Sequence, residues 1–236
     1  MLRVIAFSAA LTLASVSFGQ ALVGPPQQGP ARFDPDEVKP LLVMIEAQFD
    51  GGGTENGAGV IFQRRSRHVY IATANHVVRK GARGATAVRV YFPWVPGESF
   101  AGNVTDSSDA QLDLAVLIVD AMVPSPRGRW PVISSRDSDL PKLERGDAVH
   151  AMGYSNGRKW FSRAKPDAFA SASSDVIEFD ADYLGPGYSG GGLFDPDGAL
   201  IGMIRRDNPP TGEAISLERL VARLRRWGYN PVVHGN

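Results

Sequence analysis

The sequence reads GPGYSGGG at residues 185–192, between two runs, Val176–Asp180 and Gly198–Ile204, that are predicted to be strands. Glycines, a proline and a serine between two strands predict a tight turn that presents the hydroxyl group of Ser189. Because glycine adopts positive φ without a Cβ clash, such a turn can aim several N–H groups at one point. Two N–H groups beside a serine oxygen form an oxyanion hole, often the largest electrostatic contribution to acyl transfer. The alternative is a hairpin in which Ser189 is only a turn residue.

The five-residue pattern G-x-S-x-G around Ser189 does not by itself choose between folds. It suits the nucleophile elbow of α/β-hydrolases as well as the nucleophile loop of chymotrypsin-fold proteases. The chain also contains the same pattern around Ser155. The choice therefore depends on whether a base and an orienting acid exist, and on their order along the chain.

His76 is the best candidate for a base among the four histidines. It follows the apolar run 69–72, and the end of a buried strand would hold its imidazole firmly. His234 lies two residues from the C-terminus, where chains are usually frayed. His68 lies beside an Arg-rich turn, and His150 lies inside an alternating strand, as a structural histidine would.

Asp113 is the best candidate for the acid, because apolar residues flank it on both sides in QLDLAVL at 111–117. Asp106 and Asp109 lie in a polar stretch and are predicted to be turn residues. The order is therefore His76, Asp113, Ser189, which is the order of the chymotrypsin fold. The α/β-hydrolase order is serine, acid, histidine, so a serine esterase is disfavoured.

Composition excludes several classes of function. With 43% hydrophobic and 21% charged residues, the 236-residue chain suits one all-β domain or two small ones. Lys+Arg and Asp+Glu both number 25, so no net charge favours nucleic acid or an anionic membrane. The chain has no cysteine, which excludes disulfides, thiolate metal sites and a cysteine nucleophile.

The N-terminus predicts a cleaved signal peptide over residues 1–19, followed by an extended linker over 20–39. Arg3 supplies the positive charge, and Val4–Phe18 is an apolar run with small residues towards its end. The alternative is a membrane anchor, but the run is shorter than the roughly 20 residues that span a bilayer. Export without cysteine favours a bacterial periplasmic or secreted protein that is free of the membrane once the signal is removed.

Two sets of about six short strands are predicted on either side of a Pro/Gly-rich connector at 120–131. The first set is Val43–Phe49, Gly57–Gln63, His68–Ala74, Thr86–Phe92, Ser99–Thr105 and Asp113–Val119. The second set is Asp147–Gly153, Lys159–Arg163, Val176–Asp180, Gly191–Phe194, Ala199–Ile204 and Glu213–Ser216. A helix over 217–227 follows, with Ser216 as N-cap, Gly228 past its end and a solvated face of arginines.

The chain resembles the trypsin-like serine proteases, and among them the bacterial HtrA/Deg type. The matching motifs are GAGVIF at 57–62, YIATANHVV at 70–78, DLAVL at 113–117, GDAV at 146–149, GYSGGGLF at 187–194 and GALIG at 198–202. The resemblance covers about residues 40–228. It implies an all-β fold of two six-stranded antiparallel barrels with a C-terminal helix, occupying 40–236, with barrels at about 40–120 and 131–216.

The resemblance also implies roles for the site residues. His76 would be general base and then general acid, Asp113 would orient the imidazole, and Ser189 would be the nucleophile in the cleft between the barrels. The N–H groups of Gly187 and Ser189 would form the oxyanion hole. No cofactor or metal is expected, and the substrate would be a protein or peptide. The turn at Asp195–Gly198 is predicted to be structural, although a calcium loop is the alternative.

Two departures from the family pattern bear on regulation. Tyr188 stands where digestive members carry an aspartate that pairs with a freed N-terminus, so zymogen activation by that route is not expected. HtrA-type chains usually carry a PDZ domain after the protease, and none is expected here. Protein quality control is the role that the resemblance implies, while a large regulated cage is in doubt and the oligomeric state stays open.

The resemblance implies a primary specificity pocket between the segment before Ser189 and the strand after it. Its walls would come from Tyr183, Leu184, Ile204 and Arg205. An uncharged, apolar pocket predicts cleavage after small or medium apolar residues, because a buried Lys or Arg would lack a counter-ion. The alternatives are that Asp182 or Asp207 anchors a basic residue, or that Arg205 and Arg206 favour acidic substrates.

The sequence therefore predicts an exported serine endopeptidase that works through an acyl-enzyme intermediate. The alternative from another class is a catalytically silent module with the protease fold that binds peptides or partner proteins.

Overall fold

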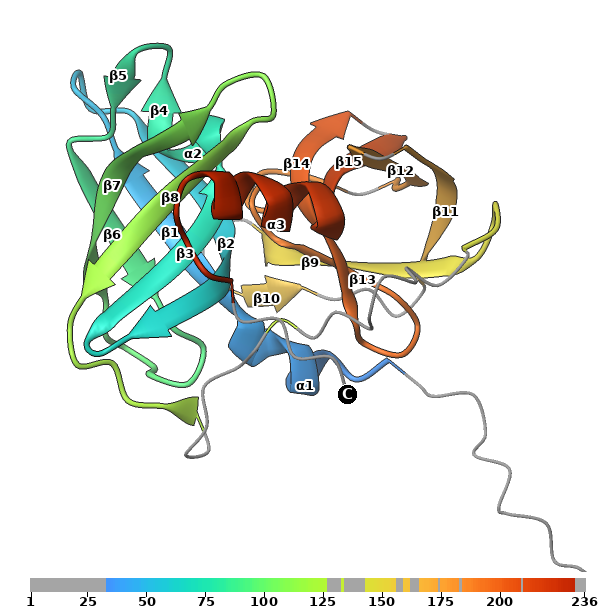
Figure 1. The fold of residues 1–236 in the computed structure, drawn as a ribbon, viewed down its shortest axis with the longest axis horizontal. Coiled ribbons are helices and arrows are strands. Elements are labelled where there is room, and N and C mark those ends of the chain that lie inside the picture. The colour runs from blue at the N-terminus through green and yellow to red at the C-terminus, as the bar shows by residue number, and fades with distance from the viewer. Residues whose placement is uncertain are drawn as a thin grey trace, which may run out of the picture. The chain divides into compact units, whose positions relative to one another are not determined.

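The computed structural model describes residues 33–126, 133, 143–155, 159–161, 166–173, 175–182, 184–208 and 210–231. The predicted signal peptide and most of the predicted linker lie outside these residues. The described part of the chain is all-β, with two closed antiparallel barrels and a C-terminal helix (Figure 1). The predicted fold class is confirmed.

The first barrel is built from six strands. They are β1 (Leu42–Gln48), β2 (Thr54–Arg65), β3 (His68–Ala74), β6 (Ala87–Tyr91), β7 (Phe100–Asp109) and β8 (Leu114–Asp120). Of these, β1, β3 and β8 are mostly buried, and β6 alternates between exposed and buried side chains. The barrel closes in the order β1-β2-β3-β8-β7-β6. The short hairpin of β4 (Arg79–Lys80) and β5 (Arg83–Gly84) lies outside it. All six predicted strands of this half are present, with ends shifted by a few residues.

The second barrel contains β9 (Ala148–Ser155), β11 (Asp167–Ala172), β12 (Val176–Asp180), β13 (Gly192–Phe194), β14 (Leu200–Asn208) and β15 (Thr211–Ser216). It closes because β9 pairs with β13 as well as with β11. Among the described strands, β10 (Lys159–Phe161) pairs with β9 alone, outside this ring.

One strand of the second barrel differs from the prediction. Lys159–Arg163 is predicted to be a barrel strand, and no strand is predicted at Asp167–Ala172. In the structure, β11 is the barrel strand and β10 is an addition to β9. Strand β11 is mostly alanine and serine, which have weak strand propensity, and Phe169 is its only large apolar residue. Pairing with β9 and β12 forms the strand in spite of this composition.

Four short or moderate helical segments complete the described fold: α1 (Pro35–Val38), η1 (Lys39–Leu41), α2 (Asn75–Val78) and α3 (Leu217–Arg226). The predicted C-terminal helix is confirmed, and its N-cap is Ser216, whose hydroxyl accepts a hydrogen bond from Arg219 N–H at 3.2 Å. Gly228 follows the helix with φ of 86°. At the N-terminal end, α1 and the first residue of η1, Lys39, lie within the predicted linker, which ends there.

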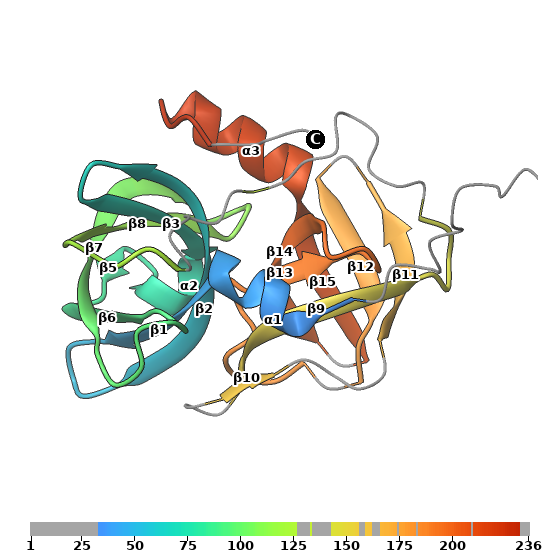
Figure 2. The same cartoon turned by 90° about the horizontal axis from the view of Figure 1, so that it is seen from below.

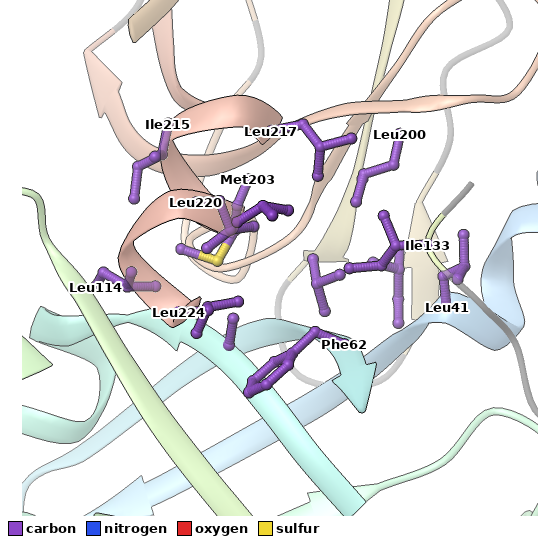
Figure 3. Packing of buried hydrophobic residues seen from close by; sticks show 14 of the residues in the cluster. Leu41, Phe62, Leu114, Ile133, Leu200, Met203, Ile215, Leu217, Leu220 and Leu224 are labelled. Carbon is purple, nitrogen blue, oxygen red and sulfur yellow. The ribbon is translucent and has the colours of Figure 1, made fainter. Parts of the chain in front are cut away.

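Three buried apolar clusters hold the fold together, one inside each barrel and one between them. The cluster between the barrels, named here the interbarrel core, receives Phe62 and Leu114 from the first barrel and Met203 from the second (Figure 3). Helix α3 covers it with Leu220 and Leu224. Residues of α1 and η1 close it from another side, where η1 contacts β1 and β2, and Figure 2 shows this stretch beside β2.

Among the described residues, none of the helices has both the length and the apolar character needed to cross a bilayer.

Candidate active site

His76 and Asp113 are brought into direct contact by the first barrel. Strand β3 ends at Ala74, and the single turn of α2 that follows carries His76. Asp113 directly precedes β8, the strand that pairs with β3. The Nδ1 atom of His76 lies 2.7 Å from Oδ2 of Asp113. A carboxylate accepts hydrogen bonds, so the tautomer with its proton on Nδ1 would donate to Asp113 here and would keep Nε2 as an acceptor.

The backbone around the pair reinforces this geometry. The other carboxylate oxygen of Asp113, Oδ1, accepts a hydrogen bond from the backbone N–H of His76 at 3.0 Å. The Asp113 carbonyl accepts a second one from Asn75 N–H at 3.1 Å. The Asp113 side chain is 14% exposed, whereas that of His76 is 49% exposed. The acid is therefore held inside while the imidazole remains accessible, as a proton-transfer group requires.

Ser189 lies in the glycine-rich turn at residues 185–192, and backbone hydrogen bonds hold this turn against the second barrel. Gly191 N–H donates to the Tyr188 carbonyl at 2.8 Å, which closes the turn. Gly190 N–H donates to the Ile204 carbonyl at 2.7 Å, and Ile204 N–H donates back to Gly191 at 2.8 Å. The described turn is buried from residue 187 onwards, and Ser189 itself is 8% exposed.

The Ser189 turn also touches the first barrel, close to the helix that carries His76. Ala58 N–H, on β2, donates to the Ser189 carbonyl at 2.8 Å. A Cβ on Gly57 would lie 2.7 Å from Val77 of α2 and 3.0 Å from the Ser189 carbonyl oxygen. Glycine at this position therefore lets the turn of the second barrel and the helix of the first barrel approach the same point.

The N–H groups of Gly187 and Ser189 are the predicted oxyanion-hole donors. Gly187 has φ of 107°, and its carbonyl accepts a hydrogen bond from Tyr154 N–H at 2.7 Å. Within the part of the chain that the structure describes, neither of the two N–H groups donates to a backbone carbonyl. The turn therefore fixes its carbonyls to the barrel and keeps these two donors out of its own backbone hydrogen bonds.

Tyr188, between these two donors, is part of the apolar core of the second barrel. Its side chain is 2% exposed. Gly153 on β9 is what admits it, because a Cβ there would lie 2.5 Å from the Tyr188 Cα and 3.0 Å from its ring. Packing of an aromatic ring therefore anchors the turn from inside the barrel.

The residues predicted to form the specificity pocket are distributed around this turn. Leu184 and Ile204 are buried in the core cluster of the second barrel. Arg205 donates from Nε and from a terminal nitrogen to Glu213 on β15, at 3.0 and 2.7 Å. Tyr183 lies outside the described residues, as do the side chains of Arg206 and Asp207. Asp182 is exposed.

The remaining histidines take other places. His68 lies 3.4 Å from the Asp120 carboxylate at the far end of β3, and His234 is outside the described residues. The His150 ring stacks on Phe33 at a centroid distance of 3.9 Å, and burial lowers the pKa of His150. His68 and His150 therefore make contacts with residues other than Asp113.

The prediction that Asp106 is a turn residue is wrong, because β7 extends through it to Asp109. The pairing of β7 with β8 is irregular between Val104 and Ser108, which accommodates a polar segment within a strand. Asp109 does cap the following turn, since its Oδ1 accepts hydrogen bonds from the N–H groups of Gln111 and Leu112 at 3.0 and 2.9 Å.

No group of three metal-ligating side chains is found among the described residues. Asp195 is buried, and its Oδ1 accepts hydrogen bonds from the N–H groups of Asp197 and Ala199 at 3.0 and 2.8 Å. This arrangement is a side-chain-capped turn, as expected for the Asp195–Gly198 segment.

Sequence reasoning does not find Thr73, although this residue lies beside the Ser189 turn. Its Oγ1 donates a hydrogen bond to the Ala58 carbonyl at 2.7 Å. A Cβ on Gly190 would lie 2.6 Å from the same hydroxyl. The available signal is a hydroxyl residue near the end of a mostly apolar strand, three positions before His76.

Comparison with known proteins gives one family. The model described as a trypsin-like peptidase domain matches residues 57–203. The chain is 30% identical to the serine protease Do-like HtrA of Lactobacillus helveticus over 172 residues, which are 69% of this chain and 38% of that protein. It is 32% identical to the protein of the same name from Bacillus subtilis (strain 168) over 163 residues, 63% of this chain and 32% of that one. The chain therefore spans 38% of the length of one of these relatives and 32% of the other.

Solved structures share the fold. The Rv3671c protease of M. tuberculosis in its active form matches with a TM-score of 0.64 at 23% identity, covering 91% of this chain and 98% of that chain. The serine endoprotease from Yersinia pestis matches with a TM-score of 0.61 at 23% identity, covering 81% of this chain and 64% of that chain.

Proposed function

Because the chain belongs to the trypsin-like peptidase family, we propose that it is a serine endopeptidase with His76, Asp113 and Ser189 as its catalytic residues. The observation that carries the proposal is the contact of 2.7 Å between His76 Nδ1 and Asp113 Oδ2, on a barrel that also binds the Ser189 turn. A histidine whose Nδ1–H is held by a carboxylate presents Nε2 as a base, which is what a serine nucleophile needs.

The reaction follows from these groups. Ser189 Oγ attacks the scissile carbonyl carbon while His76 Nε2 takes its proton, and the carbonyl oxygen becomes an oxyanion. His76 then gives the proton to the leaving amine as the C–N bond breaks, which leaves an acyl-enzyme ester. Water, deprotonated by His76, attacks this ester, and the proton returns to Ser189 as the acid product leaves. The Asp113 carboxylate stabilises the imidazolium of each step.

The N–H groups of Gly187 and Ser189 would stabilise the oxyanion. Donors that the backbone of the turn does not use are available to a developing negative charge without reorganisation. In a related case, removal of one such donor costs on the order of 10²–10³ in rate.

The experiment is active-site labelling with a fluorophosphonate, combined with hydrolysis of a casein or peptide substrate. Ser189→Ala and His76→Ala should each abolish labelling and hydrolysis, because each removes a bond-forming or proton-transfer group. Ser155→Ala is the matched control, since Ser155 is the other serine in a G-x-S-x-G pattern.

Retained hydrolysis in Ser189→Ala, or its loss in Ser155→Ala, would overturn the assignment. A wild-type protein that neither reacts with the label nor cleaves any substrate would favour a protease-fold module that only binds peptides or proteins.

We also propose that the enzyme cleaves after small or medium apolar residues. Leu184 and Ile204, two of the expected wall residues, pack together in an apolar cluster. The charge of Arg205 is matched by Glu213, so Arg205 offers little attraction for an acidic substrate. The test is a peptide library varied at the residue before the cut, in which Ala, Val or Leu should be preferred. Strong preference for Lys or Arg would instead point to Asp182 or Asp207.

A further inference from the structure

Thr73 is a buried polar residue that the proposed mechanism does not use. Its side chain has no exposed surface, and it lies near the end of β3, three positions before His76. Its hydroxyl donates a hydrogen bond of 2.7 Å to the carbonyl of Ala58. Valine has nearly the same shape and would avoid burying a hydroxyl, which costs free energy wherever the hydrogen bond is lost. Filling space therefore does not explain why this position carries a hydroxyl group.

The hydrogen bond of Thr73 lies where two strands of the first barrel separate. The pairing of β2 with β3 ends at Val60 and Ala72. Beyond that point, the N–H of Ala58 donates to the Ser189 carbonyl at 2.8 Å, and the Ala58 carbonyl accepts from the Thr73 hydroxyl. Ala58 is therefore held at both of its backbone groups. Its N–H binds the Ser189 turn, and its carbonyl binds the Thr73 side chain.

Gly190 packs directly on this hydrogen bond. A Cβ at Gly190 would lie 2.0 Å from the Ala58 carbonyl oxygen and 2.6 Å from the Thr73 hydroxyl oxygen. The two oxygens therefore form the surface on which the backbone next to Ser189 rests. Any movement of the Ala58 carbonyl would be transmitted to Ser189 through these contacts.

We propose that Thr73 is a positioning residue for Ser189, an inference that rests on the proposed function. Thr73 and His76 belong to one continuous segment that runs from β3 into α2. By holding Ala58, the Thr73 hydroxyl sets where the Ser189 turn of the second barrel lies relative to the base of the first. A displacement of about 1 Å at a reacting group can cost about 100-fold in rate.

The test compares Thr73→Val, Thr73→Ser and a matched control, Thr105→Val. Thr105 donates a similar hydrogen bond, of 3.0 Å, to the Val116 carbonyl in the same barrel. Thr73→Val should lower kcat and the rate of fluorophosphonate labelling by about 10- to 100-fold, with KM within about 2-fold. Thr73→Ser, which keeps the hydroxyl, should stay within about 3-fold of wild type, and Thr105→Val should keep its kcat.

Amide hydrogen exchange at Ala58 and Gly190 gives a second readout that needs no activity. Exchange at these two amides should be about 10-fold faster in Thr73→Val and unchanged in Thr105→Val. Wild-type kcat or exchange in Thr73→Val, a loss in Thr73→Ser as large as in Thr73→Val, or an equal loss in Thr105→Val would overturn the positioning role. A wild-type protein without labelling or hydrolysis would instead refute the proposed function, and the exchange comparison would still decide the role of Thr73.

Discussion

At the scale of single residues, the backbone of Asp113 is adapted to its place beside His76. Asp113 has φ of 56°, in the left-handed region that most residues with a Cβ avoid. Aspartate and asparagine tolerate this region better than other residues because their short side chains can bond locally. In this conformation one carboxylate oxygen reaches the His76 ring while the other binds the His76 N–H. An aspartate at this position thus both tolerates the positive φ and supplies the carboxylate that binds His76.

Gly190 is the residue at which a single methyl group should be most damaging. Its φ is +84°, and an added Cβ would meet a backbone oxygen, that of Ala58, at 2.0 Å. Gly190→Ala should therefore displace the Ser189 turn and lower kcat/KM by about 100-fold or more, with a lower unfolding temperature. Peptide hydrolysis and thermal unfolding of the same preparation measure both effects.

Gly185→Ala is the matched control, because it lies in the same turn and a Cβ there meets nothing within 4 Å. Near-wild-type kcat/KM in Gly190→Ala would show that the turn can shift without harm and would contradict the packing argument. Equal loss in both variants would mean that the turn does not tolerate any side chain.

At the scale of elements, helix α3 is more than an amphipathic cover. Its apolar face packs into the interbarrel core. Its polar face differs from the expected solvated arginines. Arg223 pairs with Asp109 at the end of β7, and Arg219 lies 3.4 Å from Asp175 before β12. The helix therefore contacts the first barrel through Arg223 and the second barrel through Arg219. Arg225 and Arg226 are exposed.

Leu224 tests whether α3 stabilises both barrels together. Its side chain has no exposed surface and lies in the interbarrel core near Phe62 (Figure 3). Leu224→Ala should lower the free energy of unfolding by about 2–5 kcal/mol, because it removes buried methyl groups and leaves a cavity. Urea unfolding followed by circular dichroism and by tryptophan fluorescence measures this change.

The exposed Arg226→Ala serves as its control, with an expected change within about 0.5 kcal/mol. The two probes should report one coincident transition in Leu224→Ala. Two separate transitions, or a loss no greater than in Arg226→Ala, would mean that α3 does not join the barrels energetically.

At the scale of the whole molecule, the candidate site depends on contact between the two barrels. His76 and Asp113 come from the first barrel, and Ser189 comes from the second. The two halves meet through the interbarrel core and through backbone hydrogen bonds such as that from Ala58 to Ser189. Closure gives each barrel a fixed set of neighbours for every strand, so the turns that emerge from it are held at defined positions.

The sequence by itself determined the strands of the first barrel, the C-terminal helix and the choice of candidate residues. These rest on local signals: alternation of apolar residues, a helix cap, a histidine after a strand and a glycine-rich turn. Local signals suffice because side-chain periodicity and turn propensity depend only on near neighbours.

Only the tertiary structure decided that β11 rather than β10 is a strand of the second barrel, and that Asp106 belongs to a strand. It alone revealed the Thr73 hydroxyl beneath Gly190 and the pairing of Arg205 with Glu213. In the case of β11, the residues have weak strand propensity, and pairing with β9 and β12 overrides it. Thr73 and Gly190 lie on different barrels, far apart in the chain. Their contact arises from how closed barrels pack against each other, and residue spacing carries no information about that packing.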